Sequence, residues 1–346
     1  MVHLRIVAPE DTAHKTLELL CASPAVVNVV HLPGASRKPE GDVILCDVAR
    51  EAASVIISDL KELDIPRTGT IAVEHLDSAI SEAFEKAEEA APGLPSDAVV
   101  WEEVESRTSE DTELSVSFVL FMVAAMQIAS VGIILDQPIL IVAAMVVGPE
   151  FGPLAGLAVA LVNLQGGLAR RSLLALAVGF PTGTIGALLS TLLFIEIGVF
   201  PEHFSQSDHP LTAFISSPDF LSFFVAFIGG VAGVLSLTSA KSGALVGVLI
   251  SVTTIPAASN IGVAAAYGDW SEAGGAAGQL AINLAAITAA GVLTLFIQRR
   301  YYVMRRRRHL MDPSRTAAGL PIGRSARAAK KVHALGGRGK AGLRRR

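Results

Sequence analysis

The chain has 346 residues, of which 51% are hydrophobic and only 17% are charged. Its charges are unevenly distributed, because residues 1–114 carry a net charge of −14, residues 115–298 carry −5 and residues 299–346 carry +15. A central segment of this length with three Lys or Arg residues excludes a soluble enzyme, a secreted disulfide-rich scaffold and a disordered protein, and leaves a polytopic membrane protein with an acidic head and a basic tail.

Residues 1–77 alternate between the periods of strands and helices. Val2, Leu4 and Ile6 alternate with polar residues, as in a half-buried strand. Helical stretches at 10–21 and 52–63 and further strands at 26–32, 43–48 and 71–76 complete the order β-α-β-β-α-β. This order predicts a ferredoxin-like α+β domain on the cytoplasmic side, a fold that does not by itself fix a function. No metal-ligand spacing, phosphate loop or nucleophile motif occurs in it, so we expect no metal, no cofactor and no enzymatic activity.

Residues 78–113 predict an acidic helical linker. Four glutamates lie between Ser81 and Ala91, and Pro92–Pro95 separates them from a second stretch around Trp101. This composition is typical of a solvated linker, and contact with the basic tail is the alternative.

Residues 114–300 contain six stretches with the roughly 20 apolar residues that a bilayer crossing needs, at 114–135, 138–164, 170–199, 218–239, 243–266 and 277–299. With six spans, every Lys and Arg of the connections falls on one side, which the positive-inside rule assigns to the cytoplasm. We therefore expect a multi-pass protein of the bacterial plasma membrane with both termini cytoplasmic.

Two of the six predicted spans are interrupted, the second at Gly148–Pro153 and the fifth at Thr253–Asn260. Each is the middle span of a set of three, which predicts a 3+3 inverted repeat of the kind that secondary transporters use; packing kinks are the alternative. Proline frees helical carbonyls, and in hydrocarbon these persist only inside protein or beside a wet cavity. The breaks therefore predict a substrate or ion path, lined by Pro149, Glu150, Pro153, Asn163, Pro256, Ser259, Asn260 and Asn283.

Glu150 is the one acidic residue within a break. A charge near the middle of a membrane costs at least about 3 kcal/mol, so such a group is usually paired, protonated or functional. Its candidate polar neighbours are Gln127, Asn163, Asn260, Gln279 and Asn283. The alternative is that Glu150 lies at a re-entrant tip nearer to the surface.

The basic tail, residues 301–346, begins just after the last span. Arg305, Arg306, Arg307 and Arg308 predict a topology anchor that contacts anionic lipid. The remainder is rich in Ala, Gly and Arg without apolar periodicity, which predicts disorder. No aromatic interleaving supports nucleic-acid binding.

The membrane segment resembles a known family over about residues 110–300. Val131–Pro153 with its Gly-Pro element, the Arg170–Arg171 pair, and Pro256–Asn260 followed by Asn283 are similar to the bacterial membrane family catalogued as domain of unknown function 389. The family's element reads closer to Ser-Pro-Leu-Met-Gly-Pro, whereas here Gly148 stands for the Ser and Glu150-Phe151 for Leu-Met. The resemblance implies an integral membrane protein and no particular activity.

Paired breaks and a single acid within them predict a transporter or channel for a small solute or ion. We expect it to work as a homo-oligomer, with a dimer favoured. The alternative is a non-transporting membrane sensor or scaffold, in which the head binds a ligand or a second head.

Overall fold

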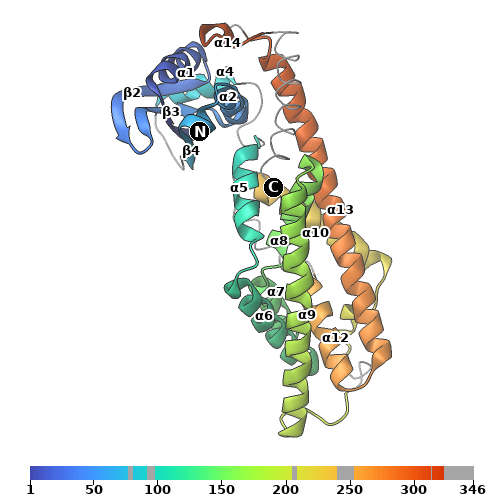
Figure 1. Cartoon of the computed structure of the whole chain (residues 1–346). Coiled ribbons are helices and arrows are strands. Elements are labelled where there is room, and N and C mark those ends of the chain that lie inside the picture. The colour runs from blue at the N-terminus through green and yellow to red at the C-terminus, as the bar shows by residue number, and fades with distance from the viewer. Residues whose placement is uncertain (77–80, 92–97, 205–208, 240–252, 313, 323–346) are drawn as a thin grey trace. The chain divides into compact units, whose positions relative to one another are not determined.

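A computed structural model describes residues 1–76, 81–91, 98–204, 209–239, 253–312 and 314–322 (Figure 1). The chain divides into two compact units. The first comprises Met1–Glu103 together with Gln298–Arg346, and the second comprises Val104–Ile297.

The first unit is built on an antiparallel sheet. Its described strands lie in the order β2-β3-β1-β4 and have the bounds Val2–Ala8 (β1), Val26–Arg37 (β2), Glu40–Val48 (β3) and Thr70–His75 (β4). Leu4 in β1 lies opposite Cys46 in β3 and Val73 in β4. Because side chains alternate along a strand, one face of the sheet is apolar and forms a core with two helices, α1 (Glu10–Ala22) and α2 (Arg50–Glu62). The elements follow the predicted order, with a short extra helix, α3 (Ile65–Thr68), before β4.

The C-terminal part of the chain is also part of this unit. Helix α13 (Trp270–His309) continues ten residues beyond the predicted end of the last span at residue 299, and a short helix, α14 (Ser314–Ala317), follows. Ala318 and Leu320 lie in the core of the first unit, and Arg315 is fully buried. The prediction of a disordered tail is therefore wrong for the described residues 301–312 and 314–322, because their apolar and charged side chains pack on the head. Residues 323–346 lie outside the described part.

The predicted linker is helical over α4 (Glu82–Ala90) and α5 (Trp101–Asp111), but its middle is not solvated. Val100 belongs to the core of the first unit, and the ring of Trp101 packs on that of Tyr302, with centroids 6.2 Å apart. The Ser54 hydroxyl donates a hydrogen bond to Glu102, at 2.8 Å. The middle of the predicted linker is therefore part of the head. Its residues 78–80 and 92–97 lie outside the described part.

The second unit is helical. It contains α6 (Val116–Ile134), α7 (Pro138–Val147), α8 (Phe151–Asn163), α9 (Gly166–Glu196), the short η3 (Ala213–Ile215), α10 (Phe220–Thr238), α12 (Thr254–Ala266) and most of α13. Within the described residues, four helices (α6, α9, α10 and α13) are long and apolar enough to cross a membrane. They correspond to the first, third, fourth and sixth predicted spans, and they identify the chain as a membrane protein.

The interruption of the second span is confirmed. Helices α7 and α8 are bent by 53° at Gly148–Glu150, and together they pass the same test of length and hydropathy. The fifth span is described only from residue 253, so the count of six rests on the sequence. The predicted interruption over 253–260 is wrong from Thr254 onward, because α12 is helical there. Pro256 fits in its first turn, where a backbone N–H has no partner within the helix.

Candidate functional site

Two half-length helices of the second unit begin with the same local pattern. Helix α8 has Glu150 as its N-cap residue and α12 has Thr253, and a proline follows three positions later in each, Pro153 and Pro256. Both helices contain 13 residues. Because a proline in the first turn removes no intrahelical hydrogen bond, each helix can start abruptly at a polar residue.

The two helix starts meet through their polar side chains. The Thr254 hydroxyl donates a hydrogen bond to Glu150 Oε1, at 2.7 Å. The Glu150 side chain is buried, with 4% of its surface exposed, and Oε2 has no hydrogen-bond partner among the described residues. A Cβ atom at Gly148 would meet the Glu150 carboxylate and lie 2.6 Å from Ile255 Cγ1. The glycine at the bend therefore allows the chain to pass this close to α12.

Helix α13 adds two amides to this contact. Asn283 Nδ2 donates to Thr253 Oγ1 at 2.8 Å, and Gln279 Nε2 donates to Asn283 Oδ1 at 3.3 Å. Both amide side chains are about 1% exposed, and Gln279 Oε1 has no partner within the described part of the chain. We call Glu150, Thr253, Thr254, Gln279 and Asn283 the break cluster.

Three other predicted site residues lie apart from the break cluster. The Ser259 hydroxyl donates to the Met126 carbonyl at 2.7 Å, and Asn260 Nδ2 donates to Glu272 Oε1 at 2.7 Å, further along α12. Asn163 ends α8, about 20 Å along the helix axis from Glu150. Pro149 lies at the bend between α7 and α8. Of the predicted lining, Glu150 therefore contacts the start of α12 through Thr254, and Asn283 contacts it through Thr253.

Sequence reasoning missed the two threonines. Thr253 and Thr254 were assigned to a break and not to a site. The signal that finds them is the spacing of Pro256 after Thr253, which repeats that of Pro153 after Glu150, together with the preference of threonine for helix N-caps.

The predicted lipid-contacting arginines have different environments. Arg306 is 3% exposed, and it donates hydrogen bonds to Asp59 at 2.5 Å and to Glu62 at 2.7 Å. The prediction of lipid contact is therefore wrong for Arg306, because its guanidinium is buried against two carboxylates of the head. Arg305 is half-buried, whereas Arg307 and Arg308 are exposed, and for these three lipid contact stays a prediction.

Asp59 is the centre of a buried ion network in the first unit. Arg306 and Arg315 both donate to its Oδ1, and His309 Nε2 lies 2.6 Å from its Oδ2. Burial alone would raise the pKa of Asp59, but the hydrogen bond with His309 and the positive charges around it outweigh burial and hold this pKa below its ordinary value. The network fixes α2 to the end of α13 and to α14.

His3, His31 and His75, on three strands of the head, each pair with a different acidic residue. His3 pairs with Asp47, His31 with Asp42, and His75 with Glu103, each at 2.7–2.8 Å. Among the described residues, no three His, Cys, Asp or Glu side chains are grouped so that they could hold a metal ion.

Comparison with known proteins finds a family of unknown function. Residues 145–289 match the family model described as a domain of unknown function (DUF389). An uncharacterised protein of Methanocaldococcus jannaschii is 26% identical over 198 residues, which are 56% of this chain and 58% of that protein. No solved structure matches the chain significantly. The resemblance stated from the sequence is confirmed, and the segment that matches the family described as DUF389 contains the whole break cluster.

Proposed function

We propose that the second unit is a transporter or channel for a small solute or ion, with a path that passes the break cluster. The observation that carries this proposal is Glu150 Oε2, which is buried and has no hydrogen-bond partner among the described residues. A buried carboxyl oxygen is costly unless a proton, a cation or a hydrogen-bond donor reaches it. A passing ion or solute supplies such a partner.

The half-helices support this proposal. A helix of 13 residues is about 20 Å long, which is shorter than the roughly 30 Å hydrocarbon core. Paired half-helices that begin near the middle of a membrane are typical of transporter binding sites. Their shared length and proline spacing also support a 3+3 inverted repeat, for which the sequence offered only the two breaks.

The first unit supports an even number of crossings. It contains both the N-terminal head and the end of α13, joined by the buried Asp59 network. This arrangement supports the proposal that both lie on one side of a membrane, in agreement with six spans and cytoplasmic termini. Its strand order agrees with a ferredoxin-like head, and we further propose that the protein assembles as a homodimer.

Flux into proteoliposomes tests the proposal. We expect the wild type to move at least one member of a panel of protons, alkali cations, halides and small neutral solutes. Glu150→Gln removes the ionisable group at nearly constant volume and should reduce that flux about tenfold or more. Glu196→Gln is the matched control, because Glu196 is an exposed residue at the end of α9.

A Glu150→Gln protein that matches the wild type for every transported species would overturn the proposal. A wild type that moves nothing in the panel favours the alternative, a membrane sensor or scaffold. The buried ion network between α2 and α13 is the observation that favours this alternative, because it would transmit a change in the head to a membrane helix.

A further inference from the structure

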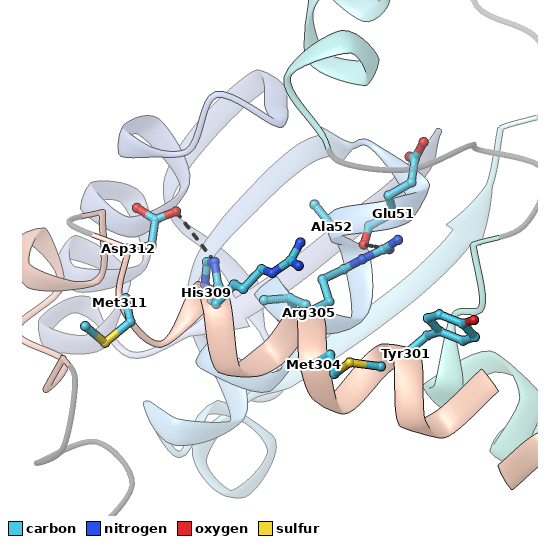
Figure 2. A pocket seen from close by; sticks show the side chains of 10 residues that line it. Glu51, Ala52, Tyr301, Met304, Arg305, His309, Met311 and Asp312 are labelled. Carbon is cyan, nitrogen blue, oxygen red and sulfur yellow. Dashed lines mark hydrogen bonds and ion pairs between the residues drawn. The ribbon is translucent and has the colours of Figure 1, made fainter. Parts of the chain in front are cut away.

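A cavity of about 760 Å³ lies within the first unit, between the beginning of α2 and the last turns of α13 (Figure 2). Helix α2 contributes Ala52 and Val55 to one wall, and α13 contributes Tyr301, Met304 and Arg305 to the other. This volume is within the range of small-molecule sites, about 300–1,000 Å³. None of these residues belongs to the break cluster.

The cavity is preformed, because the two helices that line it are fixed to each other. Arg306 lies on the buried side of α13 and bonds Asp59 and Glu62 of α2. Arg315 bonds the same two carboxylates from the segment that follows α13. These ion pairs therefore fix the spacing of the two walls. The neighbouring Arg305 and Arg308 are not part of these ion pairs and line the cavity.

These two arginines have guanidinium N–H groups without a hydrogen-bond partner among the described residues. Arg305 donates through one guanidinium nitrogen to the Glu51 backbone carbonyl at 2.7 Å, and Arg308 has no side-chain partner in the described part of the chain. They are three positions apart on a helix, so their side chains project to the same side. Guanidinium groups so arranged suit the oxygens of one phosphate.

The other charged groups at the cavity are His309, Asp312 and Glu51. His309 contacts Asp59 at 2.6 Å and Asp312 at 3.7 Å, the latter drawn as a dashed line in Figure 2. Glu51 is 2% exposed, and burial raises the pKa of its carboxyl, whose two oxygens have no hydrogen-bond partner among the described residues. The remaining wall is mostly apolar, with Met304 and Met311 as adaptable side chains.

We propose that this cavity binds an anionic phospholipid, with the phosphate on Arg305 and Arg308 and the acyl chain along Val55 and Met304. The position along α13 favours a lipid over a soluble phosphate compound. The apolar part of this helix ends at Arg299, and Tyr301, the first lining residue of α13, follows only two positions later in the same unbroken helix. This is where a phospholipid headgroup meets a membrane helix.

The test uses the full chain purified in detergent. Native mass spectrometry should show phosphatidylglycerol retained and phosphatidylcholine lost. Arg308→Gln should weaken retention about fivefold, and the double change with Arg305→Gln should abolish it. Arg307→Gln, which alters an exposed arginine of the same helix outside the cavity, should weaken retention much less than Arg308→Gln does.

Two results would overturn the proposal. Equal losses with Arg307→Gln and Arg308→Gln would show diffuse attraction to a basic helix. Retention of glycerol 3-phosphate as strong as that of the lipid would show a site for soluble phosphates. A thermal unfolding curve for each variant, followed by Trp101 fluorescence in a Trp270→Phe background, separates loss of binding from loss of the folded head, because Trp101 packs on Tyr302 in the same unit.

Discussion

Asp59 is the residue on which the attachment of α13 to the head depends. It is fully buried and is bonded by Arg306, Arg315 and His309. Removing one member of a buried ion network leaves the others without their counter-charge, so we expect Asp59→Asn to destabilise the first unit by about 3 kcal/mol or more. Urea unfolding followed by Trp101 fluorescence, in a Trp270→Phe background, measures the loss. Asp64→Asn, which breaks an exposed pair with Arg67, should change it little.

The same residue predicts a dependence on pH. The pKa of Asp59 is lower in the folded chain than its ordinary value of 3.8. Its contribution is therefore complete above about pH 5 and is lost as the pH falls below 3.8 through the folded value. The difference in stability between wild type and Asp59→Asn should shrink over this range. A difference that stayed constant down to pH 2 would contradict the assignment.

The two cysteines should differ in reactivity. Cys21 is exposed, whereas Cys46 is buried. Burial raises the pKa of Cys46 to about 12, so its thiolate is rare at neutral pH. We expect a thiol reagent at about pH 8 to modify one cysteine in the native chain and two after denaturation. Equal rates for both thiols in the native chain would contradict this.

At the residue scale, the sequence predicted the polar groups better than their partners. Glu150 and Asn283 could be found because a charge or an amide in an apolar segment is conspicuous. The Asp59 network could not, because Asp59 and Arg306 are separated by 247 positions and both belong to strongly charged segments. Nothing in the local pattern distinguishes Arg306 from the exposed Arg307.

At the element scale, α12 depends on close backbone approach. A Cβ atom at Gly262 would lie 2.5 Å from the Thr184 carbonyl oxygen and 2.9 Å from the Leu188 nitrogen, both in α9. We expect Gly262→Ala to lower the free energy of unfolding by about 1–3 kcal/mol, because neither backbone atom can move aside alone. Gly274→Ala is the control, since a Cβ there meets nothing within 4 Å. Thermal unfolding in detergent should separate the two variants.

The helix breaks show how well a proline in the sequence predicts a helix boundary. Gly148-Pro149 interrupts a span because the residue before a proline is disfavoured in helical conformation. Pro256 carries the same signal, yet it lies inside α12, in the first turn after the N-cap position Thr253, where its missing N–H removes no intrahelical hydrogen bond. A proline thus predicts a helix boundary nearby, but not on which side of the proline the boundary lies.

At the scale of the whole chain, the sequence predicted which segments are apolar but not how the ends combine. The tail was predicted to be disordered and separate from the head because it lacks apolar periodicity. In the structure, residues 1–103 and the residues after 297 form one compact unit. Opposite net charges of two distant segments are compatible with either arrangement, and only side chains such as Arg315 and Leu320, packed into the head, decide it.

Because the head and the end of α13 form one unit, cysteine labelling from either side of the membrane tests the six-span topology. Cys21 belongs to the same unit as Arg307, so we expect both on one side, whereas six crossings would place Ser271, between α12 and the apolar part of α13, on the other. In intact bacteria, a membrane-impermeant maleimide should label Ser271→Cys in a Cys21→Ser background. Cys21 itself, and Arg307→Cys in that background, should react only after permeabilisation. Labelling of Cys21 and Arg307→Cys from opposite sides would require an odd number of crossings and would contradict the proposed topology.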